Sequence, residues 1–124
     1  MEVKLLNDNL WYPTDKIFIN GQWKDCNSKK RLPIENPSNG EVIAEISDSC
    51  EIDIDEAVNS ASKALDNSWG DLTASERGRL LLKLSELVRN RIDNLAIIES
   101  FDVGKPLKQA KSDALALPRY FEFY

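Results

Sequence analysis

The chain has 124 residues, a net charge of −5 and 42% apolar residues, which suits one small globular domain and leaves no room for two. The negative charge argues against a nucleic-acid binder, because such proteins present a basic face to phosphates. No apolar run approaches the roughly 20 residues that a membrane-spanning helix needs, and residues 1–15 do not resemble a secretory signal. The sequence therefore predicts a cytoplasmic protein with no nucleic-acid or membrane partner.

Histidine is absent, and the two cysteines, Cys26 and Cys50, match no zinc-binding spacing. Without histidine, the chain lacks the commonest general base and cannot build a Ser-His or Cys-His nucleophile pair. In a reducing compartment, both cysteines are expected to be small side chains with free thiols.

The first predicted element is a β-hairpin across about 16–25, which follows a leader formed by residues 1–15. Asn20-Gly21 is a strong hairpin signal, because both residues of such a turn must accept a positive φ. A short extended piece is expected near 31–36. It belongs at a sheet edge, since Pro33 cannot donate a ladder hydrogen bond.

A turn cluster, Asn36-Pro37-Ser38-Asn39-Gly40, precedes a third strand expected near 41–46. The hydrophobic period then changes from two to about 3.6, which predicts a helix. One of Ser49, Cys50 and Asp53 is expected to cap its start. Trp69-Gly70 is expected to end it, with Gly70 in the left-handed conformation. Its apolar face consists of Ile54, Val58, Ala61 and Leu65.

The second helix is predicted from Thr73-Ala74-Ser75-Glu76, which has the form of a capping box. The apolar stripe that follows consists of Leu80, Leu81, Leu84, Leu87 and Val88. Basic residues lie mostly off this stripe. We interpret them as a solvated face biased toward the C-terminal half of the helix rather than as a binding patch.

A third helix is expected from about Asp93 to Val103 and a stop at Gly104. Pro106 begins a fourth helix, because proline in the first turn loses no hydrogen bond. Pro118 lies inside that helix and is expected to kink or split it near Ala114. The inward residues are expected to be Leu95, Ile98 and Phe101 in the third helix, and Ala110, Ala114, Leu117, Phe121 and Tyr124 in the fourth.

The expected order is three short strands followed by four helices, an α/β arrangement. Parallel-sheet enzymes alternate strands and helices, so this order is unusual for a complete domain. The sequence therefore predicts an incomplete domain.

Several stretches, in this order and at these spacings, resemble the N-terminal segment of the NAD(P)-dependent aldehyde dehydrogenases. The resemblance covers residues 16–124 and slightly favours the betaine-aldehyde branch, through residues 31–37. The stretches that carry it are the Asn20-Gly21 hairpin, Leu32-Pro33-Ile34-Glu35-Asn36-Pro37, Asp55-Glu56-Ala57-Val58, Trp69, Glu76-Arg77 and Asp102-Val103-Gly104-Lys105-Pro106.

The resemblance implies oxidation of an aldehyde to a carboxylic acid, in which a cysteine thiolate attacks the aldehyde and hydride passes to NAD or NADP. In the family, the catalytic residues and the glycine-bearing nucleotide turn lie downstream of this segment. Neither Cys26 nor Cys50 matches the family's nucleophile. We expect a truncated or partial enzyme that alone binds no NAD and oxidises no aldehyde, with the remainder of the fold or a homo-oligomer as its partner.

The resemblance also implies a monovalent cation site for K⁺ or Na⁺. The matching ligands are the main-chain carbonyls of Ile34 and Glu35 and the carboxylate of Asp102. Oxygen ligands suit such a hard cation. The alternative, which we favour, is that Asp102 ends a helix and bonds nearby backbone amides in an Asx-type turn.

A second function class is a stand-alone interaction module without catalysis. An independent module should cover its apolar faces with polar residues, whereas a segment that leans on later sequence should leave them apolar. The aromatic stretch Phe121-Glu122-Phe123-Tyr124 favours the family segment. A small complete enzyme is disfavoured, because Glu51, Asp53 and Asp55 are interpreted as carboxylates that suit a helix start.

Overall fold

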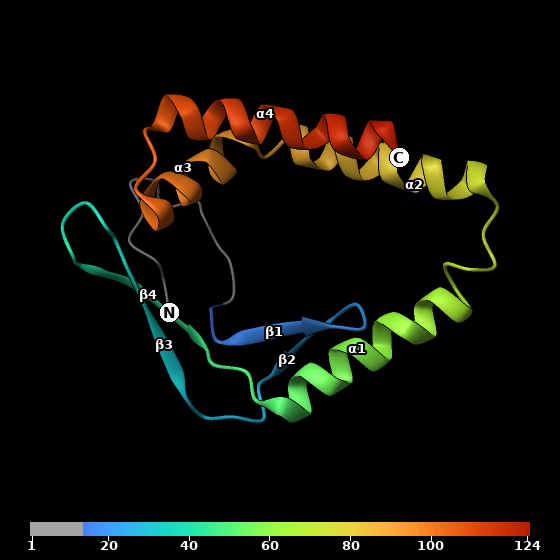
Figure 1. Ribbon diagram of the computed structural model, residues 1–124, viewed down its shortest axis with the longest axis horizontal. Coiled ribbons are helices and arrows are strands. Elements are labelled where there is room, and N and C mark those ends of the chain that lie inside the picture. Colours follow the sequence, from blue (N-terminus) through green and yellow to red (C-terminus); the bar gives the residue numbers. More distant parts are fainter. Residues whose placement is uncertain (1–13) are drawn as a thin grey trace. The chain divides into compact units, whose positions relative to one another are not determined.

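The computed structural model describes residues 14–124, which form two compact units. The first unit contains residues 14–35 and 41–71 of this range, and the second contains residues 36–40 and 72–124. The expected leader lies mostly in residues 1–13, outside the described residues. The elements are the strands β1 (Lys16–Ile19), β2 (Gln22–Asp25), β3 (Arg31–Glu35) and β4 (Val42–Ser47), and the helices α1 (Glu51–Asp66), α2 (Ala74–Arg89), α3 (Ile92–Val103) and α4 (Leu107–Phe123) (Figure 1).

Strands β1 and β2 form the predicted hairpin. Asn20 and Gly21 at its turn have φ values of 53° and 74°. This is the left-handed region that asparagine and glycine tolerate best. Phe18 pairs with Trp23 across the strands, with ring centroids 5.0 Å apart. This aromatic pair and a Lys16–Asp25 ion pair hold the hairpin register.

Strands β3 and β4 form a second antiparallel pair with an irregularity at Ile34/Glu35. Each sheet in the described part has two strands, so Pro33 lies at an edge, as expected. The expectation of three strands was one too few, because the hairpin contributes two. Short antiparallel pairs followed by helices confirm the α/β class.

Helix α1 settles the open question about its start, because Cys50 is the N-cap residue and Asp53 occupies the third helical position. Its expected end was wrong. The helix ends at Asp66 with Asn67 as its C-cap, and Gly70 does not have a positive φ. Gly70 is needed for another reason, since a Cβ atom there would collide with the carbonyl oxygen of Leu65.

In the second unit, α4 packs along both α2 and α3 (Figure 1). The capping box at the start of α2 is confirmed, with the Thr73 N–H donating to Glu76 Oε2 at 2.8 Å. The buried centre consists of Ala96, Ala110 and Ala114. These small residues let α3 and α4 approach closely but bury little apolar surface.

Pro118 lies inside α4, where it was expected to kink or split the helix. The helix is continuous from Leu107 to Phe123, so Pro118 does not split it. The Pro118 side chain is fully buried. Tertiary packing therefore offsets the backbone hydrogen bond that proline denies to the Ala114 carbonyl. Leu117 and Tyr124 are exposed rather than inward, whereas Phe121 is half-buried.

Large apolar side chains remain exposed on both units. Of the described residues, nineteen large apolar ones are exposed, whereas the five buried apolar core residues are Ile19 and four alanines. On α1, the predicted apolar face is open to solvent, with Ile54 54% and Val58 59% exposed. Each unit thus presents apolar faces that its own residues do not cover. None of the described helices is long and apolar enough to cross a membrane.

Candidate functional site

Among the described residues of the first unit, the carboxylate of Asp53 is buried, with the residue 1% exposed. Its Oδ2 accepts hydrogen bonds from Cys26 Sγ at 2.9 Å, the Cys50 N–H at 3.0 Å and Cys50 Sγ at 3.3 Å. Its Oδ1 accepts from the N–H of Asn27 at 3.0 Å and from Asn27 Nδ2 at 2.7 Å. We call these four residues the Asp53 cluster. It fastens the segment after β2 to the start of α1.

These donors hold the pKa of Asp53 far below its usual range. The Cys26 thiol is the largest cause, followed by the N–H groups of Asn27 and Cys50, and burial opposes them. The carboxylate therefore stays ionised near neutral pH and is a poor general acid or base. The sequence identified Asp53 only as a helix-start carboxylate. The cluster was missed because Cys26 lies 27 residues away in the chain.

The two cysteines are both half-buried free thiols. Each S–H donates to the Asp53 carboxylate, and this hydrogen bond requires the protonated thiol rather than the thiolate. A catalytic cysteine needs the opposite surroundings, in which a base or a cation favours the thiolate. Their positions thus give Cys26 and Cys50 a structural role at the start of α1.

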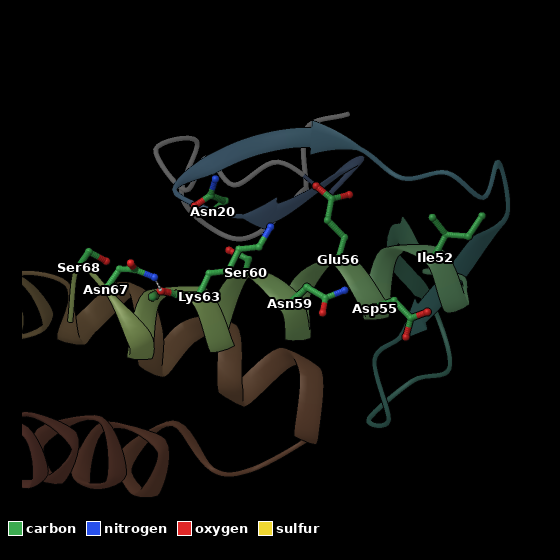
Figure 2. A pocket seen from close by; sticks show the side chains of 10 residues that line it. Asn20, Ile52, Asp55, Glu56, Asn59, Ser60, Lys63, Asn67 and Ser68 are labelled. Atoms are coloured by element: carbon green, nitrogen blue, oxygen red, sulfur yellow. Dashed lines mark hydrogen bonds between the residues drawn. The ribbon is translucent and has the colours of Figure 1, made fainter. Parts of the chain in front are cut away.

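An open groove of about 660 Å³ lies between the β1–β2 turn and α1 in the first unit (Figure 2). Asn20 reaches it from the turn, and Glu56, Ser60 and Lys63 reach it from α1. Glu56 is also ion-paired with Lys24 of β2. Asn67 donates to the Lys63 carbonyl at 2.8 Å. The lining offers hydrogen bonds and charges but no pairing of a nucleophile with a base.

The three residues predicted to bind a cation are distributed over both units. Ile34 and Glu35 lie at the end of β3 in the first unit, where the ladder is irregular. Asp102 lies near the end of α3 in the second unit and is exposed. Within residues 14–124, the Asp102 carboxylate has no hydrogen-bond partner. The alternative, in which Asp102 accepts hydrogen bonds from nearby backbone amides in an Asx-type turn, therefore receives no support. The cation site stays a prediction.

Two of the sequence stretches singled out above meet inside the second unit. Gly104 ends α3 with a φ of 71°, and a Cβ atom there would lie 2.7 Å from Cγ of Pro37. The turn at residues 36–40 therefore packs directly against the end of α3. The Ser100 hydroxyl donates to the carbonyl of Lys105 at 2.8 Å, which closes the segment between α3 and α4.

The described residues offer neither a nucleotide-binding turn nor a metal cluster. Their sheets are two-stranded and antiparallel, and no glycine lies between a parallel strand and a helix, as phosphate-binding turns require. No group of three or more Cys, Asp or Glu side chains in residues 14–124 is arranged to hold a metal ion.

A comparison with protein families matches residues 23–124 to the aldehyde dehydrogenase family. An aldehyde dehydrogenase of Agaricus bisporus is 42% identical over 102 residues, which cover 82% of this chain and 20% of that protein. Among solved structures, an aldehyde dehydrogenase mutant from Bacillus cereus has a TM-score of 0.84 and 32% identity, covering 90% of this chain and 23% of that one. A Staphylococcus aureus betaine aldehyde dehydrogenase in complex with NAD⁺ has a TM-score of 0.84 and 26% identity, covering 90% and 23%. The chain spans about a fifth of the length of the curated relatives that it matches.

Proposed function

Because this chain belongs to the aldehyde dehydrogenase family, we propose that it supplies the N-terminal part of an enzyme that oxidises an aldehyde to a carboxylic acid with NAD or NADP. The family match over residues 23–124 carries the proposal. The exposed apolar faces of both units support it, since such faces need a covering surface that the rest of the family's fold would provide.

The described residues do not fit a nicotinamide dinucleotide, because they lack the strand, glycine turn and helix that hold its phosphates. Cys26 and Cys50 do not fit the nucleophile either, because their thiols donate to Asp53. We therefore assign this segment a structural part in the enzyme. Its own residues are expected to bind neither NAD nor aldehyde, which equilibrium dialysis with NAD and an NADH assay with an aldehyde would check.

Reconstitution tests the proposal directly. The matching segment of the Bacillus cereus relative is deleted, and this chain is either added as a separate polypeptide or fused in its place. We expect NADH production from an aldehyde to return in the fusion and to be absent from each piece alone. A fusion that folds and binds NAD but produces no NADH would overturn the proposal.

A stand-alone interaction module is the alternative, and the exposed apolar residues argue against it, since an independent module should cover such faces with polar residues. The family segment and the interaction module would bind different partners. A family segment should associate with the remainder of an aldehyde dehydrogenase, whereas an interaction module should not. Size-exclusion chromatography of the two polypeptides, alone and mixed, separates these outcomes.

A monovalent cation, K⁺ or Na⁺, bound by the Ile34 and Glu35 carbonyls and the Asp102 carboxylate is a further proposal. The irregular ladder at Ile34/Glu35 and the unbonded Asp102 carboxylate in the described residues are compatible with these roles. A rise in the thermal midpoint with K⁺ or Na⁺ that disappears in Asp102→Ala would support the site. An unchanged midpoint in both salts, relative to a large organic cation at equal ionic strength, would exclude it.

The aldehyde and the compartment are finer proposals. We favour a betaine-type aldehyde because residues 31–37 resemble that branch and because a betaine aldehyde dehydrogenase is among the similar structures. The Bacillus cereus part would supply the aldehyde site of the fusion, so this preference is tested by comparing kcat/KM for betaine aldehyde and a simple aliphatic aldehyde in the natural enzyme that contains this segment. The cytosol stays the predicted compartment, and subcellular fractionation would check it.

A further inference from the structure

We propose that Cys26 and Cys50 form a reversible dithiol–disulfide pair, a redox modification site within the Asp53 cluster. This proposal concerns only the first unit and does not depend on the proposed function.

The geometry brings two thiols from distant parts of the sequence to one oxygen atom. Cys26 Sγ and Cys50 Sγ lie 2.9 and 3.3 Å from the same Oδ2 of Asp53. The two sulfur atoms are therefore at most about 6.2 Å apart, and a disulfide requires them to approach to about 2 Å, a movement to which rotation of both side chains contributes. Both residues are half-buried, so neither is fully enclosed by the fold.

The co-reactant is a low-molecular-weight disulfide such as oxidised glutathione. One cysteine loses its proton, and its sulfur attacks the oxidised glutathione, forming a mixed disulfide and releasing one glutathione thiolate. The sulfur of the other cysteine, after losing its proton, then attacks the protein sulfur of the mixed disulfide. The second glutathione leaves, so two protein thiols are oxidised while one glutathione disulfide is reduced to two thiols. The two protons pass to the released glutathiones.

The surroundings tolerate both redox states. When the two S–H donors are lost, the buried Asp53 carboxylate still accepts hydrogen bonds from the N–H groups of Asn27 and Cys50 and from Asn27 Nδ2. The carboxylate therefore remains satisfied in the oxidised form. The new bond would join the end of β2 to the start of α1 covalently, which restricts the unfolded chain.

The experiment equilibrates the protein in buffers of varied oxidised-to-reduced glutathione ratio, followed by alkylation of free thiols and intact-mass measurement. Cys26→Ser and Cys50→Ser are the matched controls, because serine keeps an O–H donor for Asp53. We expect the oxidised monomer to escape alkylation and to have a mass lower than that of the reduced chain by two hydrogen atoms. Peptide mapping should then find the Cys26 and Cys50 peptides linked to each other. We also expect the thermal midpoint to rise by about 5 °C or more on oxidation, with no such rise in either serine variant.

Three outcomes would overturn the proposal. Both thiols could remain alkylatable at the most oxidising ratio. Each could carry a separate glutathione that the other cysteine does not displace. The disulfide could form only between two copies of the chain, which non-reducing electrophoresis would reveal.

Discussion

At the scale of single residues, the buried Asp53 carboxylate is a central polar contact of the first unit. Five hydrogen bonds converge on its buried carboxylate, and they join residues before and after the β3–β4 pair. An isolated buried charge would be unfavourable, but one that accepts several donors is stabilised in its ionised form. The cluster thus fixes where α1 begins relative to the end of β2.

Replacing Asp53 with asparagine should destabilise the protein. The amide group would place N–H donors where the cluster supplies donors already, leaving buried groups unpaired. We expect the thermal midpoint near neutral pH to fall by about 5 °C or more. Asp55→Asn is the matched control, since Asp55 is exposed on the next turn of the same helix. Equal midpoints for the two variants would contradict the role assigned to Asp53.

The same carboxylate predicts how stability depends on pH. An unfolded aspartate has a pKa of about 3.9, and the hydrogen bonds hold the pKa of folded Asp53 well below that value. Its contribution is therefore present above about pH 4 and is lost as the pH falls from there toward the folded pKa. Thermal melts from about pH 6 to pH 3 should show a smaller loss in Asp53→Asn than in the unmodified protein.

Gly104 carries a second residue-scale prediction. Alanine there would have to adopt a φ of 71° and would place its Cβ atom 2.7 Å from the Pro37 side chain. We expect Gly104→Ala to lower the free energy of unfolding by about 1–3 kcal/mol. Gly78→Ala is the matched control, because Gly78 lies inside α2 with no atom near its absent Cβ. That change should stabilise by about 0.5–1 kcal/mol. Urea unfolding of both variants measures the contrast, and losses of equal size would refute it.

At the scale of elements, a capping box formed by Thr73 and Glu76 stabilises the start of α2. The Thr73 side chain accepts from the Glu76 N–H at 3.3 Å, and the Glu76 carboxylate accepts from the Thr73 hydroxyl and N–H. These bonds lower the pKa of Glu76, the hydroxyl more than the N–H. They satisfy donors that an uncapped helix start would leave unpaired.

Removing that cap should weaken the second unit. We expect Thr73→Ala to cost about 1 kcal/mol, whereas Thr73→Ser keeps the hydroxyl and should cost less. Hydrogen exchange of amides in the first turn of α2 gives the local measurement, and chemical unfolding gives the total. Exchange rates that are the same in the two variants would mean that the cap has no effect.

Signals that lie close together in the sequence predicted these elements well. Asn20-Gly21 specified the hairpin, Thr73 and Glu76 the start of α2, and Gly104 the end of α3. Interactions between distant residues were not readable. The Asp53 cluster depends on a contact with Cys26, and the continuity of α4 through Pro118 depends on packing against neighbouring helices. Gly70 is another example, because glycine is required there by the close approach of Leu65 and not by a positive φ of its own.

At the scale of the whole molecule, the apolar surface agrees with the family assignment. The buried apolar residues are mostly alanines, whereas the larger leucine, isoleucine and aromatic side chains remain exposed on α1, α2 and α4. Burying one such side chain typically contributes about 1.5–3 kcal/mol. A surface supplied by the rest of an aldehyde dehydrogenase would therefore stabilise these helices substantially.

The apolar face of α1 allows this idea to be tested by substitution. Ile54 and Val58 are more than half exposed, so replacing both with serine should change the chain's own stability by less than about 1 kcal/mol. The same double variant should lower the NADH production of the reconstituted fusion at least several-fold, because the covered face would lose its contacts. Asn59→Ser, on the same helix, should leave that activity unchanged. Activity retained by the double variant would show that this face has no partner.

The binding of a hydrophobic dye such as anilinonaphthalene sulfonate tests the central claim most directly, because it reports apolar surface on the folded chain. We predict strong, blue-shifted dye fluorescence while the circular dichroism retains its helical signal. A protein that melts in one sharp transition and leaves the dye dark would contradict the claim that its helices are shaped to be covered by another surface.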